Sequence, residues 1–97
     1  MNTQLLTPLP AEDIKRHVLA ITVDNEPGAL ARIVGLFSGR GENIESLTVT
    51  EIDHERHISL ITLVATGKAL SLFKIKNQIS RLIPVHNITD LSLAERE

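Results

Sequence analysis

The sequence predicts a small α+β domain with the order strand, helix, strand, strand, helix, strand, in which two helices cover one face of an antiparallel four-stranded sheet. Two kinds of pattern predict this class. Several short runs alternate apolar and polar residues or are apolar throughout, as strands are, whereas two runs place apolar residues three and four positions apart, as helices do. Glycine, proline and polar clusters separate the runs.

The first strand and the first helix are expected in the N-terminal half of the chain. Residues 17–24 carry apolar side chains at both alternating sets of positions, which indicates a strand covered on both faces. A helix with one buried stripe is predicted next from Leu30, Ile33, Val34 and Phe37. The glycines within residues 39–41 are expected to end this helix.

A β-hairpin is expected in the middle of the chain. Residues 44–52 alternate apolar with polar side chains, and the polar residues 53–56 then turn the chain. Residues 58–65 are apolar on both faces, which predicts a central strand of the sheet. Thr66 and Gly67 are expected to break this strand.

A second amphipathic helix and a last strand complete the order. The helix is predicted from Leu72, Ile75, Ile79, Leu82 and Ile83. Pro84 is expected to end it before a strand over residues 85–93. Prolines within residues 1–16 indicate a flexible N-terminal extension. The expected domain therefore covers residues 17–93, with a short tail at residues 94–97.

Composition argues against several classes of function. The 97 residues, 42% of them hydrophobic, suffice for one modest core, so a homodimer or higher oligomer is a natural source of further stability. A net charge of −2 and an aromatic content of two Phe argue against nucleic acid as a partner. No apolar run approaches the roughly 20 residues of a membrane span, and no signal peptide pattern is present. The absence of cysteine suits a reducing cytoplasm, where we expect this chain.

The segment that converts the first strand into the first helix is the best candidate for a functional site. Pro27 suits a first helical turn, and Gly28 lets another molecule approach the backbone without a Cβ in the way. We expect the amides of Gly28, Ala29 and Leu30 to be free at the helix start, where the peptide dipoles favour negative charge. A small anion such as the carboxylate of an amino acid would fit there.

Other polar clusters in the chain have simpler interpretations. The run His54-Glu55-Arg56-His57 lacks both the helical spacing of a zinc motif and a third ligand, so we interpret it as a solvated hairpin turn. The run Gly39-Arg40-Gly41 lacks the Lys-Ser/Thr pair of a phosphate loop, and no group is recognisably catalytic. Lys74, Lys76 and Arg81 are expected on the solvated face of the second helix, where an acidic groove of a partner could contact them.

These motifs carry a family resemblance. Residues 24–38, which end in Gly35-Leu36-Phe37-Ser38, and the later run Asn43-Ile44-Glu45-Ser46 closely resemble the regulatory small subunit of acetolactate synthase. The amino-terminal half of that subunit is an ACT domain, which has a ferredoxin-like βαββαβ fold. The resemblance covers about residues 16–93.

The resemblance implies a non-catalytic regulatory subunit without a cofactor of its own. Members bind valine or a related branched-chain amino acid, activate the acetolactate synthase catalytic subunit and confer feedback inhibition in branched-chain amino acid biosynthesis. Thiamine diphosphate, magnesium and FAD are expected in that catalytic subunit. In the family two ACT domains pair side by side into one wide sheet. The effector sits between the first strand-to-helix loop of one chain and the second-strand region of the other.

The resemblance places effector binding at Asn25, Gly28, Asn43 and Ile44. From the residues themselves, Asn25 and the amides of Gly28 and Ala29 are suited to the carboxylate, Asn43 to the ammonium group, and Ile44 to an apolar pocket. Alternatives remain open: Asn25 could be a turn residue or helix cap, Gly28 a turn requirement, Asn43 part of a loop and Ile44 a core residue. Leucine or isoleucine could also bind, since one methylene is worth only about 1 to 3 kcal/mol.

Two other functions are weighed against effector binding. The domain could be an assembly element that activates a partner without sensing an amino acid. An enzyme of the acylphosphatase type is disfavoured, because the glycine-rich, Arg-containing phosphate loop is missing. Longer family members continue into a second domain that is absent here, so this is either a short member or a fragment.

Overall fold

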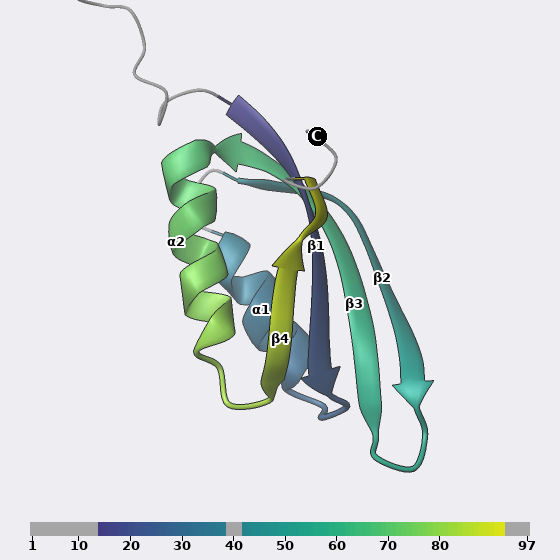
Figure 1. The fold of residues 1–97 in the computed structure, drawn as a ribbon. Helices are drawn as coiled ribbons and strands as arrows, with labels where there is room; N and C mark the ends of the chain where they lie inside the picture. Colours follow the sequence, from purple (N-terminus) through teal and green to yellow (C-terminus); the bar gives the residue numbers. More distant parts are fainter. Residues whose placement is uncertain (1–13, 39–41, 93–97) are drawn as a thin grey trace, which may run out of the picture.

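The computed structural model describes residues 14–38 and 42–92. Its elements follow the predicted order (Figure 1): β1 (Ile14–Asp24), α1 (Ala29–Phe37), β2 (Asn43–Asp53), β3 (Ile58–Lys68), α2 (Ala69–Ser80) and β4 (Val85–Asp90). The strands form one antiparallel sheet in the order β2-β3-β1-β4, so β3 and β1 are central while β2 and β4 are edges. The predicted fold class and the central position of β3 are confirmed.

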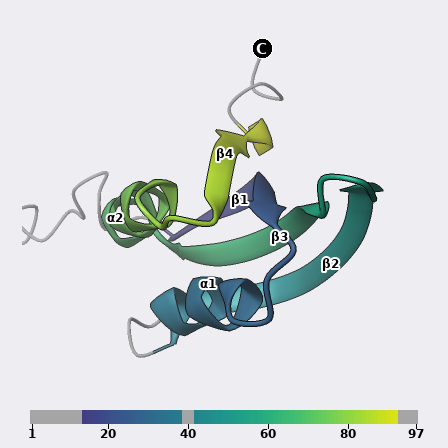
Figure 2. The same ribbon diagram turned by 90° about the horizontal axis from the view of Figure 1, so that it is seen from below.

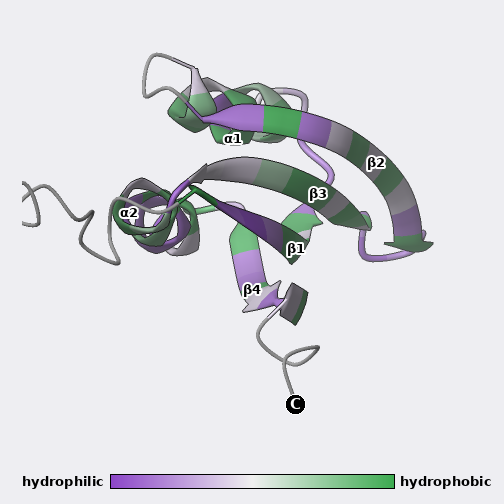
Figure 3. Cartoon of the chain, turned by 90° about the horizontal axis from the view of Figure 1, so that it is seen from above, coloured by the Kyte–Doolittle hydropathy of each residue, from purple (hydrophilic) through white to green (hydrophobic). Residues whose placement is uncertain are grey.

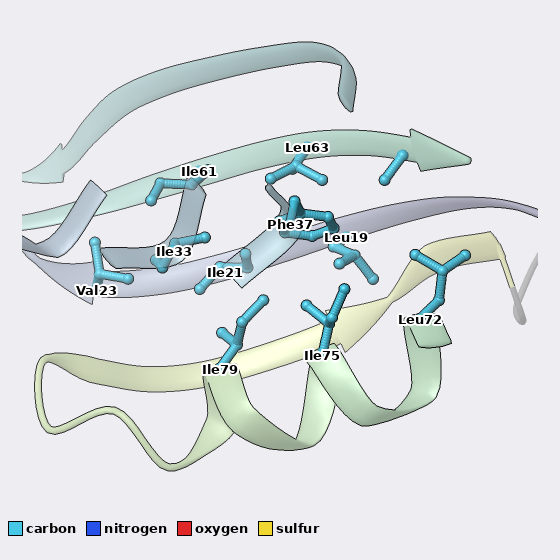
Figure 4. Packing of buried hydrophobic residues seen from close by; sticks show 11 residues of the cluster. Leu19, Ile21, Val23, Ile33, Phe37, Ile61, Leu63, Leu72, Ile75 and Ile79 are labelled. Atoms are coloured by element: carbon cyan, nitrogen blue, oxygen red, sulfur yellow. The ribbon is translucent and has the colours of Figure 1, made fainter. Parts of the chain in front are cut away.

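Both helices lie on one face of the sheet (Figure 2). The core combines alternate residues of β1 and β3 with one stripe from each helix (Figure 4): Leu19, Ile21, Val23, Ile61, Leu63, Ala65, Ile33, Phe37, Leu72, Ile75 and Ile79. The strands bury every second residue, and the helices bury residues three and four positions apart. Both sets of side chains meet in one apolar layer. α2 packs against α1, β3 and β4, which places it on the side of the sheet away from the β2 edge.

The first and third strands are longer than expected. β1 begins at Ile14, inside the predicted extension, because its first residues pair with the end of β3. The expected break at Thr66 and Gly67 is wrong, since β3 continues through both residues to Lys68. A Cβ on Gly67 would lie 2.6 Å from the Cγ of Glu42. Glycine here permits a close approach within the sheet and does not mark a turn.

The second half of the chain also departs from the expected boundaries. α2 ends at Ser80, and Ile83, predicted on its buried stripe, is 93% exposed because the chain has already turned away from the helix. β4 ends at Asp90 and not at residue 93, since the Asp90 carboxylate accepts hydrogen bonds from the Ser92 amide and hydroxyl, which bends the chain. Residues 1–13, the expected helix end at 39–41 and residues 93–97 lie outside the described residues.

A polar cluster ties β1, α2 and β4 together. His17 Nδ1 lies 2.5 Å, and Lys76 Nζ 2.7 Å, from Oδ2 of Asp90, whose side chain is only 6% exposed. Burial raises the pKa of Asp90, but hydrogen bonds from Lys76, Ser92 and His17 outweigh it and lower the pKa from 3.8 to about 2. The expectation that Lys76 lies on the solvated face of its helix is therefore wrong.

The core predicts the cost of truncation. Leu63 is fully buried in the centre of β3, so Leu63→Ala should lower the free energy of unfolding by about 2–5 kcal/mol. Ile83→Ala removes a similar side chain that is 93% exposed and should change the free energy by less than about 0.5 kcal/mol. Urea denaturation at matched protein concentration measures both. Equal losses in the two variants would contradict this assignment of the core.

The polar cluster predicts a pH dependence of stability. The pKa of Asp90 is depressed in the folded state, so its ionised form stabilises the fold above about pH 4. This contribution, on the order of 2 kcal/mol, should be lost as the pH falls from about 4 to about 2. Asp90→Asn should be less stable near pH 7 and lose less stability over that interval, as measured by urea denaturation across the pH range. An equal loss of stability in the two proteins over that pH interval would refute the role of Asp90.

Candidate functional site

The turn between β1 and α1 is held in place by its backbone. The Asp24 N–H donates to the carbonyl of Pro84 at 2.8 Å, and the Asn25 N–H donates to the carbonyl of His57 at 2.7 Å. His57 itself has a φ of 58°, an uncommon left-handed conformation for a non-glycine residue. The turn is therefore held between the α2–β4 connection and the β2–β3 hairpin, and the carboxylate of Asp24 adds a contact of 2.6 Å to His86 Nε2.

The start of α1 presents uncompensated donors. Gly28 is the N-cap residue with φ −91°, no side chain caps the helix, and the first turn has no acidic residue. The amides of Gly28 and Leu30 find no acceptor among the described residues. The expectation is wrong for Ala29, whose amide donates to the carbonyl of Glu26 at 3.1 Å. Partial positive charge from the helix dipole thus remains at an open surface.

Two exposed carboxamides are available for a ligand. The side chains of Asn25 and Asn43 make no hydrogen bond within the described part of the chain. Asn25 does not cap α1, which excludes the alternative reading as a helix cap. Asn43 begins β2 instead of lying in a loop, and its partner in β3 is Thr66. Ile44 is half-buried and packs against the core, in line with its alternative reading.

One chain does not bring the predicted site residues together. Asp24, next to the turn, pairs with Ile58 at the start of β3, whereas Asn43 pairs with Thr66 near its end. The stretch between these positions spans roughly 26 Å at about 3.3 Å per residue. Asn25, Gly28 and Ala29 therefore lie at one end of the sheet, and the Asn43–Ile44 pair lies at the other (Figure 1).

The edge strand β2 carries apolar side chains that no other described element fully covers. Hydrophobic and hydrophilic residues alternate along it (Figure 3). Val49 pairs with buried Ile61 and so faces the helix side, yet it is 46% exposed. Val34 on α1 is also exposed. The prediction that Val34 belongs to the buried stripe of the first helix is therefore wrong, since its side chain is 37% exposed. Periodicity shows that a residue is apolar but not whether a neighbouring element covers it.

The polar hairpin turn offers no metal site. His54 Nδ1 lies 3.0 Å from Glu51 Oε1, and Asp53 accepts a hydrogen bond from the Arg56 amide. Across residues 14–38 and 42–92, no three His, Asp or Glu side chains are grouped so that they could hold a metal ion. Within the same residues, neither helix has the length and apolar character needed to cross a membrane.

Comparison with known sequences gives one consistent result. Residues 19–87 match the family model described as the AHAS small subunit-like ACT domain. The chain is 44% identical over 80 residues to the acetolactate synthase small subunit of Haemophilus influenzae, covering 82% of this chain and 48% of that protein. The corresponding subunit of Aquifex aeolicus is 39% identical over 87 residues, covering 87% and 45%. The chain thus spans about half the length of these curated relatives.

Solved structures agree with the sequence comparison. The acetolactate synthase small subunit of Thermotoga maritima superposes with a TM-score of 0.65 at 29% identity, covering 78% of this chain and 47% of that one. The ACT domain of a GTP pyrophosphokinase from Chlorobium tepidum gives the same TM-score at 14% identity, covering 80% and 99%. The second likeness shows the fold alone.

The open helix start predicts the effect of a charge at Gly28. A Cβ there meets nothing within 4 Å, so Gly28→Asp should fold and place a carboxylate beside the free amides. Its unfolding free energy without ligand should stay the same or rise by up to about 1 kcal/mol. Gly35→Asp, on the same helix and equally unobstructed, should show no such gain. Thermal unfolding measures both, and a marked loss only in Gly28→Asp would contradict the open helix start.

Proposed function

This chain belongs to the family of acetolactate synthase small-subunit ACT domains, and we propose that it is a non-catalytic regulatory module whose effector is a branched-chain amino acid, valine in the first instance. One observation carries the proposal. Free amides at the start of α1 and the predicted residues at the start of β2 lie at opposite ends of β3. A complete site then requires a second copy of the chain.

The unpaired edge of β2 suggests how two copies meet. If two β2 strands pair antiparallel about Thr48, the midpoint of Asn43–Asp53, then Asn43 of one copy lies opposite Asp53 of the other. Asp53 pairs with Ile58, which in turn pairs with Asp24 beside the turn. Such a dimer brings the two halves of the site to the same end of the joined sheet. It also covers Val49, which a single chain leaves 46% exposed.

The chemistry of the two halves suits a zwitterion. In our proposal the amides of Gly28 and Leu30 receive the carboxylate, with Asn25 beside them. Asn43 of the second copy serves the ammonium group, while Ile44 and Val49 contribute apolar surface for the side chain. The register places Ile44 on the helix side of the sheet and Asn43 on the other side, so the ligand must lie at the end of the joined strands to contact both.

Regulation follows if the effector binds one arrangement of the dimer better than another. Valine bound across the β2 edges would shift the population of the dimer and so change how it engages the catalytic subunit. The reaction itself, with thiamine diphosphate, magnesium and FAD, would take place in that partner. The names of the relatives support the proposed partnership.

Isothermal titration of the chain with L-valine tests the proposal. Wild type should bind, D-valine should bind more weakly, and Gly28→Asp should lose at least about tenfold in affinity because two carboxylates would compete for the same amides. Gly35→Asp is the matched control and should bind as wild type does. Since the site is shared, valine should also raise the dimer fraction in sedimentation velocity of dilute protein.

The outcomes separate effector binding from the main alternative. If wild type gives no heat and no thermal shift with millimolar valine, effector binding is refuted. Should such a protein still raise the activity of the catalytic subunit on mixing, the chain is an assembly element only. Equal affinity in the Gly28→Asp and Gly35→Asp variants would remove the helix start from the site.

A further inference from the structure

The outer face of α2 combines exposed apolar and basic side chains. The helix buries Leu72, Ile75 and Ile79 against the core. Five residues spaced three or four positions apart run along its opposite side, which we call the outer α2 face: Leu70, Phe73, Lys74, Asn77 and Arg81. All five are exposed, and Arg81 is the C-cap residue of the helix.

The apolar part of this face resembles the anchor of a protein interface. Phe73 is one of two aromatic residues in the chain, and it is 56% exposed whereas Phe37 is buried. Leu70, one turn earlier on the same side, is 48% exposed. Single exposed apolar residues are common, so this pair alone indicates nothing. Aromatic anchors flanked by arginine are nevertheless the usual centre of binding energy at interfaces.

The basic part of the face has no acidic counterpart in the described structure. Several other cations of the described residues form ion pairs, as Lys76 does with Asp90 and Arg16 with Glu45, whereas Lys15 and Arg32 do not. Lys74 and Arg81 form no ion pair within residues 14–38 and 42–92, and α2 contains no acidic residue. The face therefore presents two positive charges whose complement must come from elsewhere.

The shape of the face favours a side chain as the ligand. Lys74, Asn77, Gln78 and Arg81 line a surface depression of about 240 Å³. Pockets for small molecules are usually about 300–1,000 Å³. The depression is therefore small for a cofactor and suits a carboxylate side chain of another protein.

A second copy of this chain is a poor occupant. Two-fold pairing of the face with itself would bring Lys74 and Arg81 close to their own counterparts, and like charges at an interface are unfavourable. The face also lies away from the β2 edge, because α2 packs beside β4. Dimer formation through β2 would leave it free.

We infer that the outer α2 face is the docking surface for a different protein, one that offers an apolar pocket for Phe73 rimmed by Asp or Glu side chains. On the basis of the proposed function, the outer α2 face contacts the acetolactate synthase catalytic subunit. Effector binding at the β2 edge and partner binding at α2 then use separate parts of one chain.

Binding of the full chain to the catalytic subunit of the same organism, measured by biolayer interferometry, tests the inference. Phe73→Ala, Lys74→Glu and Arg81→Glu should each weaken binding by about tenfold or more. The two charge reversals should also reduce its salt dependence. The matched controls are Ile83→Ala, which removes a 93% exposed side chain outside the stripe, and Arg32→Glu on the exposed side of α1. Both controls should bind the partner as wild type does, and the Phe73, Lys74 and Arg81 variants should keep the wild-type affinity for valine.

Each outcome bears on a different claim. Wild-type partner binding by the Phe73, Lys74 and Arg81 variants would overturn the docking surface while leaving the proposed function intact. No partner binding by wild type would overturn the proposed partnership and this inference with it. A fall in the oligomeric mass of the Phe73→Ala variant alone in sedimentation would show that the face joins copies of the chain, which also overturns the inference.

Discussion

The register of β3 with both of its neighbours is the constraint on which the rest of the structure depends. β3 pairs with β1 and β2 along almost its whole length, so it sets how far apart the ends of those strands lie. The turn after β1 and the start of β2 consequently occupy opposite ends of the sheet. In the proposed site an isolated chain would hold two half-sites that cannot meet, so association between copies is part of the proposed mechanism.

The turn after β1 separates the groups that hold it from the groups that can bind. Carbonyls of Pro84 and His57, from two distant connections, receive the amides of Asp24 and Asn25. The Asn25 carboxamide and the Gly28 amide remain without partners among the described residues. A loop fixed by its neighbours' backbone loses little conformational freedom when a ligand arrives, which favours binding.

Sequence patterns predicted the elements and the fold because periodicity and turn residues are local properties. They failed where a distant residue decides the outcome. Gly67 was expected to break the strand, but it lies inside β3, where its missing Cβ makes room for Glu42. Lys76 was expected on the solvated face of its helix, but its ammonium group pairs with Asp90, fourteen residues later in the sequence. Of the candidate site, the helix start and the carboxamides were accessible from sequence, whereas the bonded amide of Ala29 and the exposure of Val49 depend on three-dimensional contacts.

The pairing of β1 with β4 has a consequence for how the chain acquires its structure. The first and last described strands are neighbours, so the sheet contains contacts between residues far apart in sequence. During synthesis, one edge of β1 stays without hydrogen-bond partners until the residues of β4 have left the ribosome. High contact order of this kind slows folding, and an open central strand in a nascent chain is prone to mispairing. The domain should therefore become resistant to aggregation only after β4 has been synthesised and has paired with the open edge of β1.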